Sequence, residues 1–140
     1  MKRFILTTLC LVMLSATAWA KEVKVGVLSD LSGPTADVGL SYAKGVMDCI
    51  KHVNETVFIP GVTVKPLQVD YAYNVQQALS AYKRFKSEGI VALQGWGTGD
   101  TEALTGFVGR DKLPTLSASY SAHLTNPKKA PYNFFVAADY

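Results

Sequence analysis

A glycine-rich stretch in the middle of the chain has the residue types of an anion-binding turn. Three glycines alternate between residues 95 and 99, directly after a short apolar run, and Thr98 and Thr101 add hydroxyl groups. Glycines let the backbone approach a ligand closely, and the unpaired N–H groups at the start of a following helix favour a negative charge. The stretch therefore predicts a site for a carboxylate or a phosphate. The alternative is a tight strand-to-helix turn that is capped by Asp100.

Hydroxyl groups gather again in a second stretch, Ser117 to Ser121, which follows another apolar run. Several hydroxyls at the end of a strand can hydrogen-bond a ligand, and the alternative is a polar strand end with local turn bonds. A nucleophilic serine is disfavoured, because the hydrolase elbow needs the pattern GxSxG and the residues two positions away from Ser119 are serines. The stretch therefore predicts binding rather than catalysis.

The sequence argues against a nucleotide cofactor and against a metal. The dinucleotide fingerprint GxGxxG would need glycine at position 100, where the chain has aspartate, and no GKS or GKT of a phosphate-binding loop occurs. His52 and His123 lie far apart and have no partner at metal-ligand spacing, so zinc is not expected. We expect neither a cofactor nor a metal.

The first twenty residues have the features of a secretory signal. Lys2 and Arg3 precede an almost wholly apolar run, and Ala18-Trp19-Ala20 has the small-x-small pattern of a cleavage site. This pattern predicts cleavage after Ala20. A membrane anchor is disfavoured, because a span needs ~20 apolar residues and the run is shorter.

Removal of the signal would leave a nearly neutral chain. The formal net charge is +3, and Lys2 and Arg3 supply two of these charges, so residues 21–140 carry +1. This balance does not indicate binding to nucleic acid or to an anionic membrane. Cys49 is then the single cysteine of residues 21–140. We expect it to be a buried small hydrophobe, and the alternative is a thiol with a role of its own.

The elements that must position these stretches alternate between strand and helix. The expected strands are residues 22–29, 62–71, 90–94, 113–118 and 132–137, and the expected helices are residues 38–56, 75–87 and 100–109. Pro66 indicates either an edge position or a bulge for the second strand. Asn74 and Gly89 are typical residues for the two ends of the second helix. This order predicts an α/β fold, a parallel sheet with helices on both faces.

Ligands of open α/β sheets bind at the carboxyl ends of the strands. Three loops of the expected fold lie at that edge, namely residues 30–39, 95–100 and 117–122. In the first of them Ser32 and Gly33 are candidates to face a cleft, and the alternative is a plain turn around Pro34.

The whole chain resembles the periplasmic substrate-binding proteins of branched-chain amino-acid type ABC transporters, the leucine-binding protein family with the type 1 periplasmic binding fold. The similar pieces are, in order, VKVGVLSDLSGPTADVG, KG, VDY, NVQQA, VALQG, LPTLSAS and YNFFVAAD. They cover essentially all of the chain after the signal. The resemblance implies two α/β lobes joined by a hinge. Residues 21–140 are therefore expected to form most of the N-terminal ligand-binding lobe, as a fragment of a longer protein with a second lobe beyond Tyr140.

The resemblance also implies which residues hold the ligand. In the family, hydroxyls and backbone groups from two loops of the first lobe hold the α-carboxylate and the α-ammonium of the ligand. Those loops correspond to residues 95–101 and 117–121. The expected contacts are Thr98, Gly99, Thr101, Ser119 and Ser121, with Trp96 and Tyr120 as walls. Gly99 stands near the position of the family's usual serine, so a neighbouring threonine or the Gly99 N–H must replace that hydroxyl.

The implied function is non-enzymatic. The resemblance implies a periplasmic binding protein that delivers an amino acid, an amide or an aromatic acid to an ABC permease in the inner membrane, without nucleic acid. The alternatives are a sensory receptor domain with the same fold and an α/β enzyme. If Trp96 and Tyr120 line the cleft rather than the core of the lobe, they favour a larger, flatter or aromatic ligand.

Overall fold

The computed structural model of the chain describes residues 21–138, and the expected signal segment, residues 1–20, lies outside them. Strands and helices alternate along the described residues. In chain order they are β1 (Lys21–Ser29), α2 (Ala36–Glu55), β2 (Val62–Asp70), α3 (Val75–Ser87), β3 (Ala92–Gln94), α4 (Thr98–Asp111), β4 (Thr115–Ser117), the 3₁₀ turn η1 (Ala122–Thr125) and β5 (Asn133–Phe135). The α/β class and the order of the elements predicted from the sequence are confirmed.

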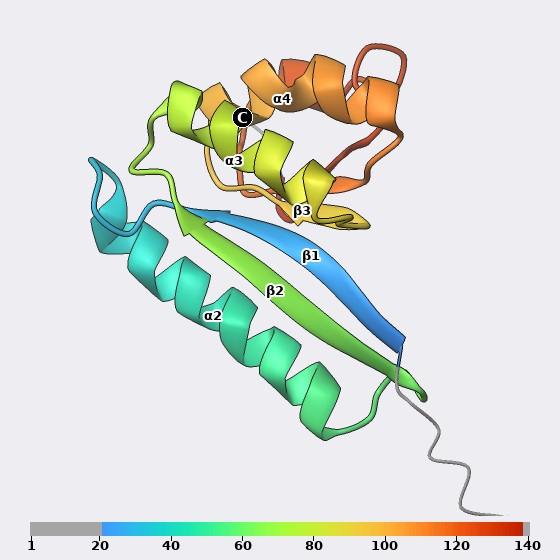
Figure 1. Cartoon of the computed structure of the whole chain (residues 1–140). Coiled ribbons are helices and arrows are strands. Elements are labelled where there is room, and N and C mark those ends of the chain that lie inside the picture. Colours follow the sequence, from blue (N-terminus) through green and yellow to red (C-terminus); the bar gives the residue numbers. More distant parts are fainter. Residues whose placement is uncertain (1–20, 139–140) are drawn as a thin grey trace, which may run out of the picture.

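The strands form one parallel sheet in the order β2-β1-β3-β4-β5. Figure 1 shows β1 and β2 side by side. β2 is an edge strand of this sheet, the first of the two alternatives that Pro66 indicated, because an edge position does not require a backbone N–H from every residue. The last three strands are shorter than predicted. β3 begins later than predicted and ends at Gln94 as predicted, while β4 and β5 are shorter at both ends.

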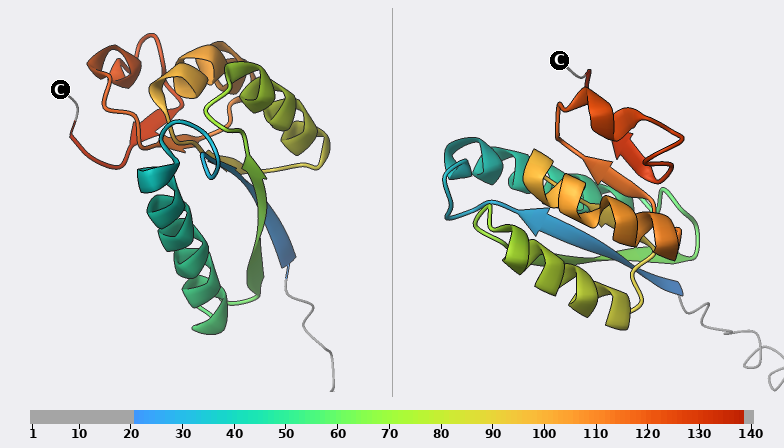
Figure 2. Two further views of the ribbon diagram at one scale, coloured as in Figure 1. Left: turned by 90° about the vertical axis from the view of Figure 1, so that its left-hand side faces the viewer. Right: turned by 90° about the horizontal axis from the view of Figure 1, so that it is seen from above.

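Helices cover both faces of the sheet, as predicted. α2 lies against β1 and β2 on one face, while α3 and α4 lie side by side on the other (Figures 1 and 2). The main core is enclosed between the sheet and this helix pair. Its largest fully buried side chains are Tyr71, Phe85, Leu28, Leu93 and Leu104.

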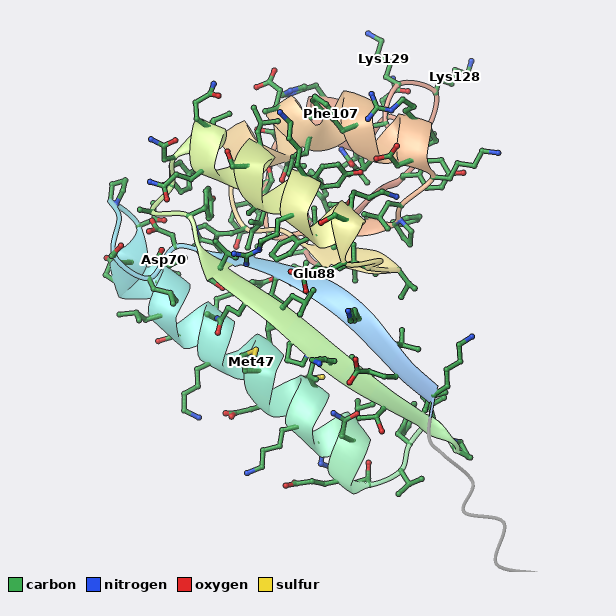
Figure 3. The ribbon with its side chains drawn as sticks, in the orientation of Figure 1. Met47, Asp70, Glu88, Phe107, Lys128 and Lys129 are labelled. Atoms are coloured by element: carbon green, nitrogen blue, oxygen red, sulfur yellow. The ribbon has the colours of Figure 1, made fainter. Side chains whose placement is uncertain are left out.

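Both ends of α3 follow the local rules that the sequence suggested. The Asn74 side chain accepts a hydrogen bond from the backbone N–H of Gln77, which satisfies one free donor of the first turn. Gly89 follows the helix with a φ of 79°, a conformation that glycine adopts without strain. Figure 3 shows Asp70 at the carboxyl end of β2 and Glu88 at the far end of α3, so α3 returns the chain along the sheet.

One half of the α2 face of the sheet lacks a covering helix among the described residues. Leu116 on β4 is 41% exposed, and Phe134 on β5 is 51% exposed. Val136, which follows β5, is 53% exposed. The expected buried state of Cys49 is wrong, because its side chain is exposed on α2. It borders an apolar trough of about 470 Å³, which is lined by α2 and by Val25, Gln94 and Val136.

Across residues 21–138, none of the helices combines the length and the apolar character that a membrane crossing requires.

The contact between β1 and α3 predicts a steric limit at Gly26. A Cβ atom at this position would lie 2.7 Å from Cδ2 of Phe85, which is fully buried. We therefore expect Gly26→Ala to lower the free energy of unfolding by about 1–3 kcal/mol, as overpacked cores do. The matched control is Gly45→Ala in α2, where a Cβ meets nothing within 4 Å and should stabilise the helix by about 0.5–1 kcal/mol. Urea titration of both variants checks the prediction, and equal stabilities would contradict it.

Candidate functional site

The order of the strands creates a crevice at their carboxyl ends. From β1 the chain passes to β2 on one side, and β3, β4 and β5 then fill the other side. The connections after β1 and β3 therefore diverge, and α/β sheets bind ligands at this kind of point. A pocket of about 160 Å³ lies there, and the loops that follow four different strands line it. The lining residues are Thr35, Tyr73, Trp96, Gly97, Thr98, Ala118, Ser119 and Tyr120.

Three hydroxyl groups from the two predicted loops come together at this pocket. Oγ1 of Thr98, the first residue of α4, lies 2.8 Å from Oγ of Ser119 and 3.5 Å from Oγ of Ser121. Thr98 and Ser119 line the pocket, and Ser121 adjoins them. Hydroxyls can rotate to donate to an anion, and the first turn of a 14-residue helix favours negative charge. The arrangement suits a carboxylate.

Thr101 and Gly99 do not line the pocket. The Thr101 hydroxyl is buried, donates to the Gly97 carbonyl at 2.6 Å and lies 2.6 Å from Oγ of Ser117. A Cβ at Gly99 would face Val75 at the start of α3. Thr101 therefore ties the two loops together, and a direct ligand contact for either residue stays a prediction.

Asp100 is not the cap of α4, because the helix begins at Thr98 with Gly97 at the N-cap. This corrects the alternative of an Asp100-capped turn. The carboxylate lies inside the first turn, where it is buried and accepts a hydrogen bond from the Tyr71 hydroxyl at 2.7 Å. Burial raises the pKa of Asp100 and, together with this carboxylate, raises the pKa of Tyr71. Asp100 stabilises the loop through hydrogen bonds on its buried side, and it is not among the pocket-lining residues.

Trp96 belongs to both the core and the pocket. Its half-buried side chain packs against the core cluster and also lines the pocket. Trp96 is therefore both a part of the core and a wall of the pocket. The indole Nε1 donates to Oγ1 of Thr35 at 2.9 Å, and the ring lies 4.9 Å from that of Tyr42. Burial raises the pKa of Tyr42, and the neighbouring Tyr120 phenol raises this pKa further. Tyr120 also lines the pocket and is 48% exposed.

Sequence reasoning missed Thr35 and Tyr73, which line the pocket from the loops after β1 and β2. In the first loop Ser32 donates to the Asp70 carboxylate instead, and Gly33 packs against the backbone of Ala72. The available signal was position alone, since both missed residues follow the carboxyl end of a strand. Their contacts with Trp96 and Gly97 depend on the order of the strands in the sheet, which the sequence pattern did not include.

The pocket is formed without charged side chains. Its lining residues comprise hydroxyl, aromatic and small side chains. Across residues 21–138 the structure also brings together no group of three or more histidine, cysteine, aspartate or glutamate side chains that would suit a metal ion. The geometry therefore fits recognition of a small anion or carboxylate by neutral donors beside aromatic rings.

Comparison with known proteins identifies the fold and the family. The family model described as "Periplasmic binding protein" matches residues 22–140. A solved ABC transporter substrate-binding protein from Aeropyrum pernix is 40% identical with a TM-score of 0.79, over 86% of this chain and 32% of that one. A branched-chain amino acid ABC transporter protein from Thermus thermophilus, solved with bound valine, is 27% identical with a TM-score of 0.78 over the same shares.

A third structure, LivJ from Streptococcus pneumoniae in complex with isoleucine, is 22% identical with a TM-score of 0.77, over 85% of this chain and 34% of that one, and supports the fold alone. The chain thus spans about a third of the length of the solved structures that it matches. A comparison with curated protein sequences finds no match. With the family model covering nearly all of residues 21–140, this chain belongs to the periplasmic binding protein family, which includes the substrate-binding proteins of branched-chain amino-acid ABC transporters.

Proposed function

We propose that this protein binds a small carboxylate-bearing solute, such as an amino acid or a related acid, and delivers it to an ABC permease. The observation that carries the proposal is the pocket at the carboxyl ends of the strands, where Thr98 and Ser119 present hydroxyls beside the start of α4. Each hydrogen bond to a charged ligand group contributes about 1.5–3 kcal/mol, so two or three of them orient a carboxylate.

The same geometry favours binding over catalysis. A serine nucleophile needs a general base within hydrogen-bond reach. The Ser119 hydroxyl instead lies against the Thr98 hydroxyl and accepts a bond from the Ser121 N–H. His123, two residues further, faces Glu102 at 3.6 Å and is not a lining residue of the pocket.

Delivery to a permease would follow from closure around the ligand. The solved relatives are about three times as long as this chain, and in the proposed mechanism a further lobe closes over the pocket. A ligand that contacts both lobes shifts the population toward the closed form, because it binds that form more tightly. The permease would recognise the closed form. The proposed role of the described lobe is to bind the carboxylate first.

The family works outside the cytoplasm, and we place this protein in the periplasm after removal of residues 1–20. Cleavage after Ala20 would keep all the described residues of β1, of which Lys21 donates its backbone N–H to the Gly61 carbonyl.

This placement predicts the mature N-terminus. Protein exported by a bacterial host should begin at Lys21, and its intact mass should lack residues 1–20. Mass spectrometry of the periplasmic fraction measures both. Retention of the first twenty residues in the fractionated protein would contradict the signal assignment.

The carboxylate-binding role predicts a stabilising ligand within a defined panel. We expect at least one amino acid or small organic acid, added to the full-length mature protein at 100 times its Kd, to raise the free energy of unfolding by about 2.7 kcal/mol. A thermal-shift screen followed by titration calorimetry measures this. If no carboxylate in the panel binds, the proposed function is wrong.

The hydroxyl of Thr98 should contribute directly to that affinity. Thr98→Val keeps the shape of the side chain but removes the donor, so we expect the Kd of the ligand to rise by about tenfold or more, the equivalent of at least ~1.4 kcal/mol. The matched control is Thr63→Val on β2, where the side chain is exposed and is not among the lining residues. Titration calorimetry compares the two, and equal affinities would refute the assignment of Thr98.

A further inference from the structure

The aromatic walls of the pocket are held in fixed positions. Trp96 donates through Nε1 to Oγ1 of Thr35, and the Thr35 hydroxyl in turn donates to the buried carboxylate of Asp30 at 2.6 Å. On another side the indole meets the ring of Tyr42 at a centroid distance of 4.9 Å. The hydrogen bond and the ring contact restrain the indole, so it presents a constant flat surface to the pocket.

Tyr73 forms a second wall, and its backbone is held in an uncommon conformation. Ala72 and Tyr73 have φ values of 49° and 56°, in the left-handed region that non-glycine residues seldom adopt. This conformation places the Tyr73 ring against Gly97, where a Cβ would lie 2.5 Å from Cε2 of the ring. The ring also stacks on Tyr71 at 6.0 Å. Strained residues of this kind persist where the surrounding structure holds them, and they cluster at ligand sites.

The position of the donors beside aromatic side chains suits a ring that carries a carboxylate. The part of the pocket that this lobe forms has a volume of about 160 Å³. The hydroxyls of Thr98 and Ser119 line the same pocket as Trp96 and Tyr73. The Asp100 carboxylate, which would repel a ligand anion, is buried and bonded to Tyr71.

On the basis of the proposed function, we propose that the solute is an aromatic carboxylate. Its carboxylate contacts the hydroxyls of Thr98 and Ser119, and its ring packs against Trp96 and Tyr73. Aromatic pairs in offset or edge-to-face contact are more stable than their buried area alone predicts, and this protein offers two such contacts. A branched aliphatic side chain of similar size gains the burial but not the ring contacts. Thr35 acts as a positioning residue, because its hydroxyl accepts the hydrogen bond from the Trp96 indole.

The test compares benzoate with cyclohexanecarboxylate on the full-length mature protein by titration calorimetry. The two acids share the charge and nearly the same size, and they differ in the aromatic ring. We expect benzoate to bind about tenfold more tightly. Phenylalanine and 3-cyclohexylalanine form a second pair that differs in the same way and carries an ammonium group. The pair that binds more tightly shows whether the solute is an aromatic amino acid or a simple aromatic acid, and leucine and valine are titrated beside them.

Leucine or valine binding more tightly than both aromatic compounds would overturn this inference and leave the proposed function standing. Equal affinities within each pair would overturn it as well. Failure of every carboxylate to bind would overturn both the inference and the proposed function, so the two failures are distinguishable.

Variants of Trp96 and Thr35 test whether the aromatic side chains of the pocket cause the preference for benzoate. Trp96→Leu should weaken the binding of benzoate about tenfold and change the binding of cyclohexanecarboxylate little. The difference between the Kd values of the two acids should therefore disappear. Thr35→Val should reduce the ratio of the two Kd values, because Trp96 loses its hydrogen-bond acceptor, and Thr35→Ser should restore it. Circular dichroism and urea titration verify that each variant folds. An unchanged ratio in folded Trp96→Leu protein would refute the aromatic contact, and an unchanged ratio in Thr35→Val would refute the positioning role.

Discussion

The burial of Asp30 at the carboxyl end of β1 is the constraint on which the pocket depends. Its side chain has no exposed surface, and its two oxygens accept hydrogen bonds from the N–H groups of Gly33 and Thr35 and from the Thr35 hydroxyl. A buried carboxylate is costly unless such donors surround it. The loop before α2 therefore has to fold around this one residue, and that fold places Thr35 where it can hold the indole of Trp96.

Close packing at the strand ends joins the remaining loops to this one. Gly33 lies against the backbone of Ala72, and Gly97 lies against the ring of Tyr73, so the loop after β2 contacts both the loop after β1 and the loop after β3. The hydroxyls of Thr101 and Ser117 connect α4 to the end of β4. Each contact needs a small side chain or a hydrogen bond at one position, and together they form one pocket from four separate loops.

The two faces of the sheet differ in how fully they are covered. Parallel strands are normally buried on both faces, and the side that carries α3 and α4 follows this rule. On the other side α2 covers β1 and β2, while Leu116 and Phe134 are exposed. The apolar trough beside Cys49 lies on this α2 side of the sheet, whereas the ligand pocket lies at the ends of the strands, so the two features are separate.

The sequence by itself determined the elements and the edge of the sheet where ligands bind. Strand and helix periodicities, Asn74, Gly89 and Pro66 act over a few residues, and local rules of this kind can be read without the fold. Local patterns also indicated the loops that contain Thr98 and Ser119. The tertiary structure alone decided that Thr35 and Tyr73 join them, that Thr101 and Asp100 turn inward, and that Cys49 is exposed. Those outcomes depend on which strands are neighbours and on which helix covers which face, because a side chain is buried or available according to what packs against it from distant parts of the chain.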